Sequence, residues 1–310
     1  MNMKNSIMTM LAEASDPLSG QEISRRLLVS RVAVWKHIEQ LKKSGVEIAS
    51  TAKGYRLVST PDTPFPWLFG ARSALVHYLP EVDSTMNRAT ELARQGCPPY
   101  TLVVADRQSQ GRGRMQRQWQ SEAGGLYFSM VLRPALPPRQ GPLVNLAVAL
   151  DLVETLASCC GVVAQVKWPN DVLVEERKIA GILSQMEMEG EELTFLNVGV
   201  GLNLNNRPEI ADKPAVSVLQ LTGRRVHRAQ VLTEFLDRFE KRMQTFSRPG
   251  IIAAWKEKTI TLGRRVTIAT LSDSHEGLAV DVDADGGLVL EMADGSRRTV
   301  FYGDCFHSPL

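Results

Sequence analysis

The segment ADRQSQGRGRMQRQW, residues 105–119, places two glycines among four arginines. Guanidinium groups bind phosphate and carboxylate oxygens through paired hydrogen bonds, and glycine lets the backbone approach a ligand closely. The segment therefore suits a mobile loop that closes over an anionic ligand. A solvated basic loop, or an RG-type nucleic-acid segment, has the same composition. A Walker loop is excluded because no Gly-Lys pair occurs in the chain.

A second segment, QVKWPNDVLVEERKIAGILSQ at residues 165–185, holds lysines on either side of a predicted strand pair. Pro169 favours an extended Trp168, and Asn170-Asp171 suits a turn. Lys178 then enters an apolar strand. A lysine in that position commonly extends its ammonium group to solvent, and the alternative is a cation that binds a ligand anion.

Two further segments are ambiguous when taken alone. Asp83-Ser84-Thr85 could cap the helix predicted after it, or offer hydroxyls to a ligand. In NVGVGLNLNN, residues 197–206, two glycines fall in a predicted strand, where glycine costs stability unless something packs against the backbone. This is not a dinucleotide fingerprint, because Leu204 stands at the third glycine position.

Several function classes lose their usual support. The histidines form no H-E-x-x-H motif, no G-x-S-x-G occurs, and the four cysteines form no C-x-x-C pair. The N-terminus is too polar for a signal peptide. The apolar stretch from Leu143 to Val166 is interrupted by polar residues, which favours a core helix over a membrane span. A reducing cytoplasm is expected.

The elements that must position these segments divide the chain into parts. Residues 5–44 predict three short helices, with Ser19 and Ser30 capping the second and third, and a β-hairpin around Lys53-Gly54 follows. The third helix carries basic residues outside its apolar face, as a DNA-reading helix does. Three prolines in residues 60–70 predict a linker. A mixed α/β region and a small all-β module come next, and in the α/β region the short connections around Glu175 and Gly190 predict antiparallel neighbouring strands. The predicted boundaries are 1–60, a linker at 61–75, 76–258 and 259–310.

Charge is distributed unevenly along these parts. The net charge is +2, yet residues 1–60 hold nine Lys/Arg and five Asp/Glu, or +4, which leaves −2 for the remainder. A basic N-terminal piece on a near-neutral body indicates contact with nucleic acid. The residues expected to face DNA are Ser30, Arg31, Trp35, Lys36, His37 and Lys53.

The order of the motifs carries more than any one of them. D-S-T, Q-x-x-G-R-G-R-x-x-R-x-W, K-W-P-N-D, R-K-I-A-G-I-L and V-G-V-G-L-N closely resemble the biotin–protein ligases. The basic helices and hairpin before them resemble the winged helix-turn-helix of the family's bifunctional ligase/repressors. The resemblance covers about residues 5–300. It implies an α+β, multi-domain fold: a winged helix-turn-helix, a central mixed α/β ligase domain of the class II synthetase-like kind, and a C-terminal SH3-like β-barrel.

The resemblance also implies a reaction and its partners. ATP, Mg²⁺ and biotin would give biotinyl-5′-AMP, and the biotin would pass to a lysine of the biotin carboxyl carrier domain of acetyl-CoA carboxylase. An adenylate-bound homodimer would repress biotin genes at an operator. The alternative to repression is an N-terminal domain that only stabilises the ligase, and the alternative to ligation is a biotin-sensing transcription factor without ligase activity. Its discriminator is whether biotin triggers pyrophosphate release from ATP.

Site roles follow from the resemblance position by position. The residues it assigns to biotin or the adenylate are Ser84, Thr85, Gln108, Gly111, Arg112, Gly113, Arg114, Lys178 and Asn203. Of these, Arg114 and Lys178 would be catalytic, Asn203 would contact adenine, and no protein-held metal is expected. Trp119 would anchor the loop.

The sequence also departs from the family pattern at three positions. Met86 stands where the family often has Asn, with Asn87 directly after it. Met115 and Gln116 replace a frequent Arg-Gly pair. These departures concern the biotin pocket and the charge of the loop.

Overall fold

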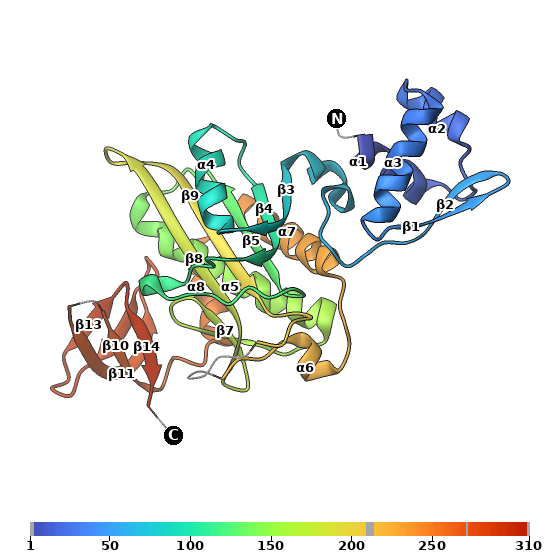
Figure 1. The fold of residues 1–310 in the computed structure, drawn as a ribbon. Coiled ribbons are helices and arrows are strands. Elements are labelled where there is room, and N and C mark those ends of the chain that lie inside the picture. The colour runs from blue at the N-terminus through green and yellow to red at the C-terminus, as the bar shows by residue number, and fades with distance from the viewer. Residues whose placement is uncertain (1–2, 209–213, 271, 309–310) are drawn as a thin grey trace. The chain divides into compact units, whose positions relative to one another are not determined.

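The computed structural model describes residues 3–208, 214–270 and 272–308, and they form two compact units (Figure 1). The first unit contains residues 1–78 and 227–229, and the second contains the rest. Each is described by itself.

The first unit is a three-helix bundle with a hairpin. Its elements are α1 (Met3–Glu13), α2 (Gly20–Leu27), α3 (Arg31–Lys43), β1 (Glu47–Thr51), β2 (Gly54–Ser59) and the 3₁₀ segment η1 (Pro66–Leu75). Ser30 caps α3 as predicted, because its Oγ accepts from Ala33 N over 3.1 Å. Ser19 caps α2 in the same way, while the Glu22 carboxylate pairs with Arg26. Apolar side chains at helical spacing, such as Ile7, form the core.

The proline-rich stretch is more ordered than a linker. The sequence predicts only a connection there, but η1 forms within it. Trp67 of this segment packs against the helical core of the first unit, and Phe65 stacks on Trp67 with ring centroids 4.3 Å apart. Aromatic burial of this kind explains why a segment with three prolines belongs to the compact unit.

The second unit is built on a seven-stranded sheet in the order β3-β4-β5-β9-β8-β7-β6. The strands are β3 (Val76–Val82), β4 (Thr101–Gln108), β5 (Leu126–Leu132), β6 (Gln165–Lys167), β7 (Asp171–Val174), β8 (Arg177–Glu189) and β9 (Glu192–Leu202). The pairs from β4 to β6 are antiparallel. For β7–β8 and β8–β9 the short connections predict this. In the central pair Gly181 lies opposite Gly201.

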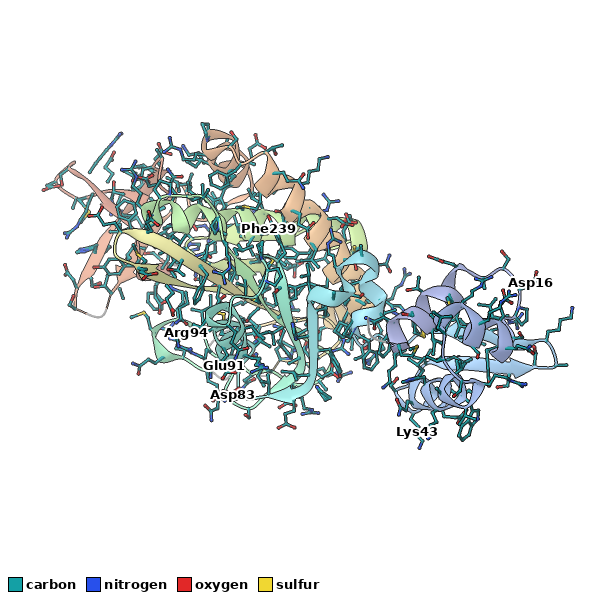
Figure 2. The ribbon with its side chains drawn as sticks, turned by 90° about the horizontal axis from the view of Figure 1, so that it is seen from above. Asp16, Lys43, Asp83, Glu91, Arg94 and Phe239 are labelled. Atoms are coloured by element: carbon teal, nitrogen blue, oxygen red, sulfur yellow. The ribbon has the colours of Figure 1, made fainter. Side chains whose placement is uncertain are left out.

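Helices cover both faces of this sheet. Figures 1 and 2 show α4 on one face and α5 with α7 on the other. The helices of this unit are α4 (Thr85–Arg94), α5 (Gly141–Cys160), α6 (Val218–Thr222), α7 (Arg228–Gln244) and α8 (Arg248–Lys258), with 3₁₀ turns η2 (Arg114–Gln116) and η3 (Pro138–Gln140). By length and composition α5 could cross a membrane, but 67% of its apolar window is buried inside the molecule. It is the core helix that the sequence predicts.

The C-terminal module is a five-stranded antiparallel sheet in the order β13-β12-β11-β10-β14. Its strands are β10 (Arg265–Ala269), β11 (Ser274–Val282), β12 (Leu288–Glu291), β13 (Arg297–Val300) and β14 (Asp304–His307). Trp168 ties it to the large sheet, since its backbone N–H donates to Thr261 and its indole N–H donates to Gly286 O over 3.2 Å.

Candidate active site

The glycine/arginine loop, residues 109–119, directly follows β4 in the connection to β5 and folds back on itself through a bridge between Arg112 and Gln118. Arg114 is its partly buried cation. One guanidinium nitrogen donates to Asn170 Oδ1 over 3.1 Å, and another donates to Gly303 O over 3.0 Å. Burial lowers the pKa of Arg114, and the carboxylates of Asp304 and Asp171 oppose that shift. The loop is thus held between the large sheet and the C-terminal module.

The remaining loop arginines have specific partners. Arg112 Nη1 donates to Asn87 Oδ1 over 3.0 Å, and Arg117 forms an ion pair with Asp304. Between them Met115 and Gln116 adopt φ values of +50° and +59°. This is the left-handed region that favours glycine, so Gln116 occupies a conformation for which the family's frequent glycine is better suited.

A buried cluster of hydroxyl and amide groups lies where β4 and β5 meet the start of α4. Gln108 Oε1 accepts from Thr85 N over 2.8 Å and from Thr85 Oγ1 over 3.0 Å. Ser129 Oγ donates to Thr85 Oγ1 over 2.8 Å. Sequence reasoning missed Ser129, because an isolated serine in an apolar strand carries no signal.

Ser84 stands beside this cluster with an unused hydroxyl. It is fully buried, its side chain makes no cap hydrogen bond to α4, and its Oγ has no partner among the described residues. A buried polar group without a partner is costly. The simple capping explanation therefore fails for Ser84, and a ligand acceptor or donor is the remaining use for its hydroxyl.

Lys178 does not extend into solvent. Its Nζ lies 2.5 Å from Asp171 Oδ1 across the β7–β8 pair and 5.3 Å from the centre of the Trp119 ring. The Trp119 indole packs flat against the strand glycines. A Cβ at Gly201 would come within 2.3 Å of the Trp119 ring, and one at Gly181 within 2.9 Å. The close approach predicted for the strand glycines is thus made by Trp119.

Asn203 directly follows β9 and belongs to a set of buried asparagines there. It is 2% exposed, and its Oδ1 accepts from Asn206 Nδ2 over 2.9 Å. Its backbone N–H donates to Ile179 O over 2.9 Å. In this conformation Asn203 Oδ1 is engaged within the protein, so an adenine amino group that donated to this oxygen would share it with Asn206.

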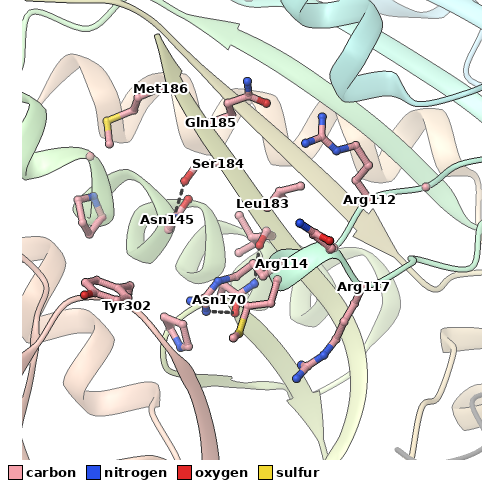
Figure 3. A pocket seen from close by; sticks show the side chains of 18 of the residues that line it. Arg112, Arg114, Arg117, Asn145, Asn170, Leu183, Ser184, Gln185, Met186 and Tyr302 are labelled. Atoms are coloured by element: carbon pink, nitrogen blue, oxygen red, sulfur yellow. Dashed lines mark hydrogen bonds between the residues drawn. The ribbon is translucent and has the colours of Figure 1, made fainter. Parts of the chain in front are cut away.

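A pocket of about 930 Å³ opens against the glycine/arginine loop. In Figure 3 the three loop arginines lie on one side, Tyr302 of the C-terminal module lies on the other, and Asn145 and Ser184 lie between them. Of the residues predicted to bind biotin or the adenylate, those that line it are Gly111, Arg112, Gly113 and Arg114. Ser84, Thr85, Gln108, Lys178 and Asn203 do not line this pocket. Trp119, on the strand glycines beside Lys178, is likewise outside its lining.

The first unit has a separate groove of about 720 Å³ between α3 and the hairpin. Of the residues predicted to face DNA, Arg31, Trp35 and Lys53 line it, while Ser30 and Lys36 are exposed outside it. His37 is only partly exposed, and its Nδ1 is buried without a partner among the described residues. It lies six residues after Arg31, about 240° around the helix, so it is not part of this surface.

Comparisons with known proteins agree on all parts of the chain. Residues 78–203 match the model of the biotin/lipoate A/B protein ligase family, residues 4–56 match an HTH domain, and residues 261–308 match the biotin protein ligase C terminal domain. The chain is 36% identical to the bifunctional ligase/repressor BirA of Bacillus spizizenii over 92% of both chains. It is 28% identical to that of Escherichia coli over 88% of both.

A solved structure gives the same result for the ligase part. The biotin protein ligase from Aquifex aeolicus in complex with biotin and ATP is similar with a TM-score of 0.64 and 29% identity. The match covers 75% of this chain and 98% of that one.

Proposed function

The chain belongs to the biotin–protein ligase family, and from that premise we propose that it is an ATP-dependent biotin ligase with a DNA-binding repressor arm. It activates biotin as biotinyl-5′-AMP and transfers the biotin to a lysine of a carboxyl carrier domain. The observation that carries the ligase proposal is the arrangement of Arg114 and Lys178. Arg114 lies within the loop, partly buried and bonded to Asn170. Lys178 Nζ lies 5.3 Å from the centre of the Trp119 ring, which packs against Gly181 and Gly201.

The first half-reaction requires cations. The biotin carboxylate attacks the α-phosphorus of ATP, a C–O–P bond forms, and pyrophosphate leaves. Two unit charges roughly 4 Å apart repel by about 4 kcal/mol at an effective dielectric of about 20. Arg112, Arg114 and Lys178 offset that repulsion and the charge that develops on the phosphoryl oxygens. When substrate binds, the Lys178 ammonium group leaves the Asp171 carboxylate and pairs with the carboxylate of biotin.

The hydroxyl and amide cluster binds the polar head of biotin. Ser84 offers an unpartnered buried hydroxyl, and Thr85 and Gln108 are already linked beside it. Met86 is buried, and a Cβ at Gly199 of β9 would lie 2.8 Å from its sulfur and 3.4 Å from Ser129 Oγ of this cluster. The second half-reaction forms a C–N bond between the acceptor lysine and the biotin carbonyl, while the bond to AMP breaks. The loop keeps water from the mixed anhydride until then.

We expect Mg²⁺ to bind in this site together with the phosphates of ATP. The described residues contain no group of three His, Cys, Asp or Glu side chains that could hold a metal. Magnesium is commonly bound by one or two carboxylates together with substrate phosphates. Asp171, once released by Lys178, is the carboxylate best placed to contribute. The ion would supply charge neutralisation on the phosphates.

The regulatory half of the proposal concerns the first unit. Arg31, Trp35 and Lys53 line one groove, and Ser30 and Lys36 are exposed outside it. This is the surface of a helix-turn-helix that enters a major groove while a hairpin follows the backbone. We infer a homodimer that forms with bound adenylate, occupies an operator of biotin genes, and acts in the cytoplasm.

The test separates activation from transfer. Pyrophosphate release from ATP is measured with and without biotin, and labelled biotin is followed onto a carrier domain. Replacing Lys178 with Met should lower biotin-dependent pyrophosphate release by about 10²–10³-fold, as when one charge-stabilising donor is removed. The exposed Lys241→Met on α7 is the matched control. No biotin-dependent release by the unaltered protein would indicate a sensor without ligase activity.

A further inference from the structure

The DNA-facing groove of the first unit contains exposed apolar side chains among its cations. Val32 is 62% exposed and Trp35 is 53% exposed, and both line the groove with Arg31 and Lys53. They stand three positions apart on α3, so they lie on the same side of the helix. Apolar side chains left this open usually have a partner that covers them.

The position of Val32 in the helix identifies what it can reach. Val32 is the second residue of α3, directly after the Ser30 cap and Arg31. In a helix-turn-helix the N-terminal residues of the second helix contact the edges of the bases. Phosphates suit Arg31 and Lys53, but an aliphatic side chain gains nothing from a phosphate. The apolar group that base pairs present in the major groove is the thymine C5-methyl.

We propose that Val32, backed by the Trp35 ring, reads thymine C5-methyl groups in the operator. This rests on the proposed repressor function and adds the kind of base that the helix selects. Arg31 and Lys53 then set affinity and register through phosphates, while Val32 contributes discrimination by burying a methyl group. Burial of one methyl group stabilises a complex by about 0.8 kcal/mol, or about fourfold in affinity.

The experiment removes only the methyl groups. The full chain, with biotin, ATP and Mg²⁺, is used to select duplexes from a random-sequence pool at one fixed salt concentration, because phosphate contacts depend on salt. Each dT of the selected duplex is then replaced singly by dU. We expect one or two positions per half-site at which dU weakens binding about fourfold.

Two serine variants assign the effect to its residue. Val32→Ser should bind the dT and dU duplexes equally. Val58→Ser is the matched control, because Val58 is 57% exposed on β2 of the same unit and does not line the groove. It should keep the discrimination of the unaltered protein. Neither change removes a buried side chain, so both variants should fold.

The outcomes are distinct. If the unaltered protein binds dT and dU duplexes equally, or if Val32→Ser still discriminates, the proposal is overturned and the apolar pair serves a protein partner instead. If no duplex is enriched over random DNA, the repressor function itself fails, and methyl reading fails with it. Loss of discrimination in Val32→Ser but not in Val58→Ser supports the proposal.

Discussion

Arg112 in the glycine/arginine loop is joined to Asn87 on α4, because its Nη1 donates to Asn87 Oδ1 over 3.0 Å. Asn87 in turn donates to Asp83 Oδ2 over 2.7 Å, and this hydrogen bond is the main reason that the pKa of Asp83 lies below its usual value. A carboxylate, an amide and a guanidinium thus form a chain from the start of α4 to the loop. Asn87, the residue after Met86, also lines the loop pocket. Through this hydrogen bond Asn87 positions Arg112.

Breaking this chain should affect substrate binding more than chemistry. For Asn87→Ala we expect the KM for biotin or ATP to rise about tenfold, which corresponds to the loss of one hydrogen bond to a charged group. The kcat of adenylate formation should change less than threefold, because Arg112 keeps its charge and loses only its orientation. Steady-state pyrophosphate release measures both constants. A fall in kcat at unchanged KM would contradict this role.

The contact between Trp119 and Gly201 gives a steric prediction. A methyl group at position 201 would lie 2.3 Å from the Trp119 ring, so Gly201→Ala should displace the indole and open the loop. We expect biotin-dependent pyrophosphate release to fall at least tenfold, while the midpoint of thermal unfolding moves by only a few degrees. Gly250→Ala near the start of α8 is the control, because its nearest neighbour is Ser247 Oγ at 3.2 Å. Equal activity of both variants would remove Trp119 from the site.

Leu28, in the turn of the helix-turn-helix, carries backbone strain. It adopts φ +55° at the C-cap of α2 with a side chain that is 91% exposed. A left-handed conformation costs a residue with a Cβ about 1–2 kcal/mol, and glycine avoids this at some cost in chain entropy. Leu28→Gly should therefore raise the free energy of unfolding by about 0.5–1 kcal/mol. Leu28→Ala keeps the Cβ and should change it little. Denaturant unfolding of the full chain compares the two.

His307 at the end of β14 makes stability depend on pH. Burial lowers its pKa from 6.5 to about 4, helped by the positive charges of Lys167 and Arg264. Between those values the unfolded chain binds a proton that the folded chain does not, so stability falls as pH decreases from 6.5 toward 4. Replacing His307 with Gln should flatten that part of the curve and leave the pH dependence above pH 7 unchanged, because the imidazole is neutral in both states there.

Asp151 on α5 has the opposite effect on the pH dependence of stability. Burial raises its pKa from 3.8 to about 6, although Arg242 hydrogen-bonds to it. As the pH falls, Asp151 therefore takes up a proton in the folded chain before it does so in the unfolded chain, and its contribution to stability rises as pH falls from 6 toward 3.8.

The measurement for His307 removes the contribution of Asp151 by comparing two proteins that both contain it. The difference in stability between the unaltered protein and His307→Gln, measured by urea unfolding from pH 7 to 4.5, isolates the histidine. A difference that does not vary with pH would refute its titration.

Local signals in the sequence were sufficient for much of the fold. Ser30 predicts the start of α3, and the Lys53-Gly54 turn predicts the hairpin, because caps and turns depend on a few neighbouring residues. The short turns around Glu175 and Gly190 predict antiparallel neighbours, which the strand pairing confirms. The segment with three prolines was predicted only as a linker. Its packing through Phe65 and Trp67 depends on contacts with residues distant in the chain.

The sequence by itself determined the family and the residue types of the site, because motifs such as G-R-G-R and K-W-P-N-D keep their order and spacing along the chain. Only the tertiary structure decided which atoms meet. It placed Ser129 beside Thr85, separated His37 from the DNA-facing groove, paired Lys178 with Asp171, and set Arg114 against Gly303. The physical reason is that hydrogen bonds and ion pairs between distant segments depend on sheet register and helix orientation. Those are properties of the packed molecule.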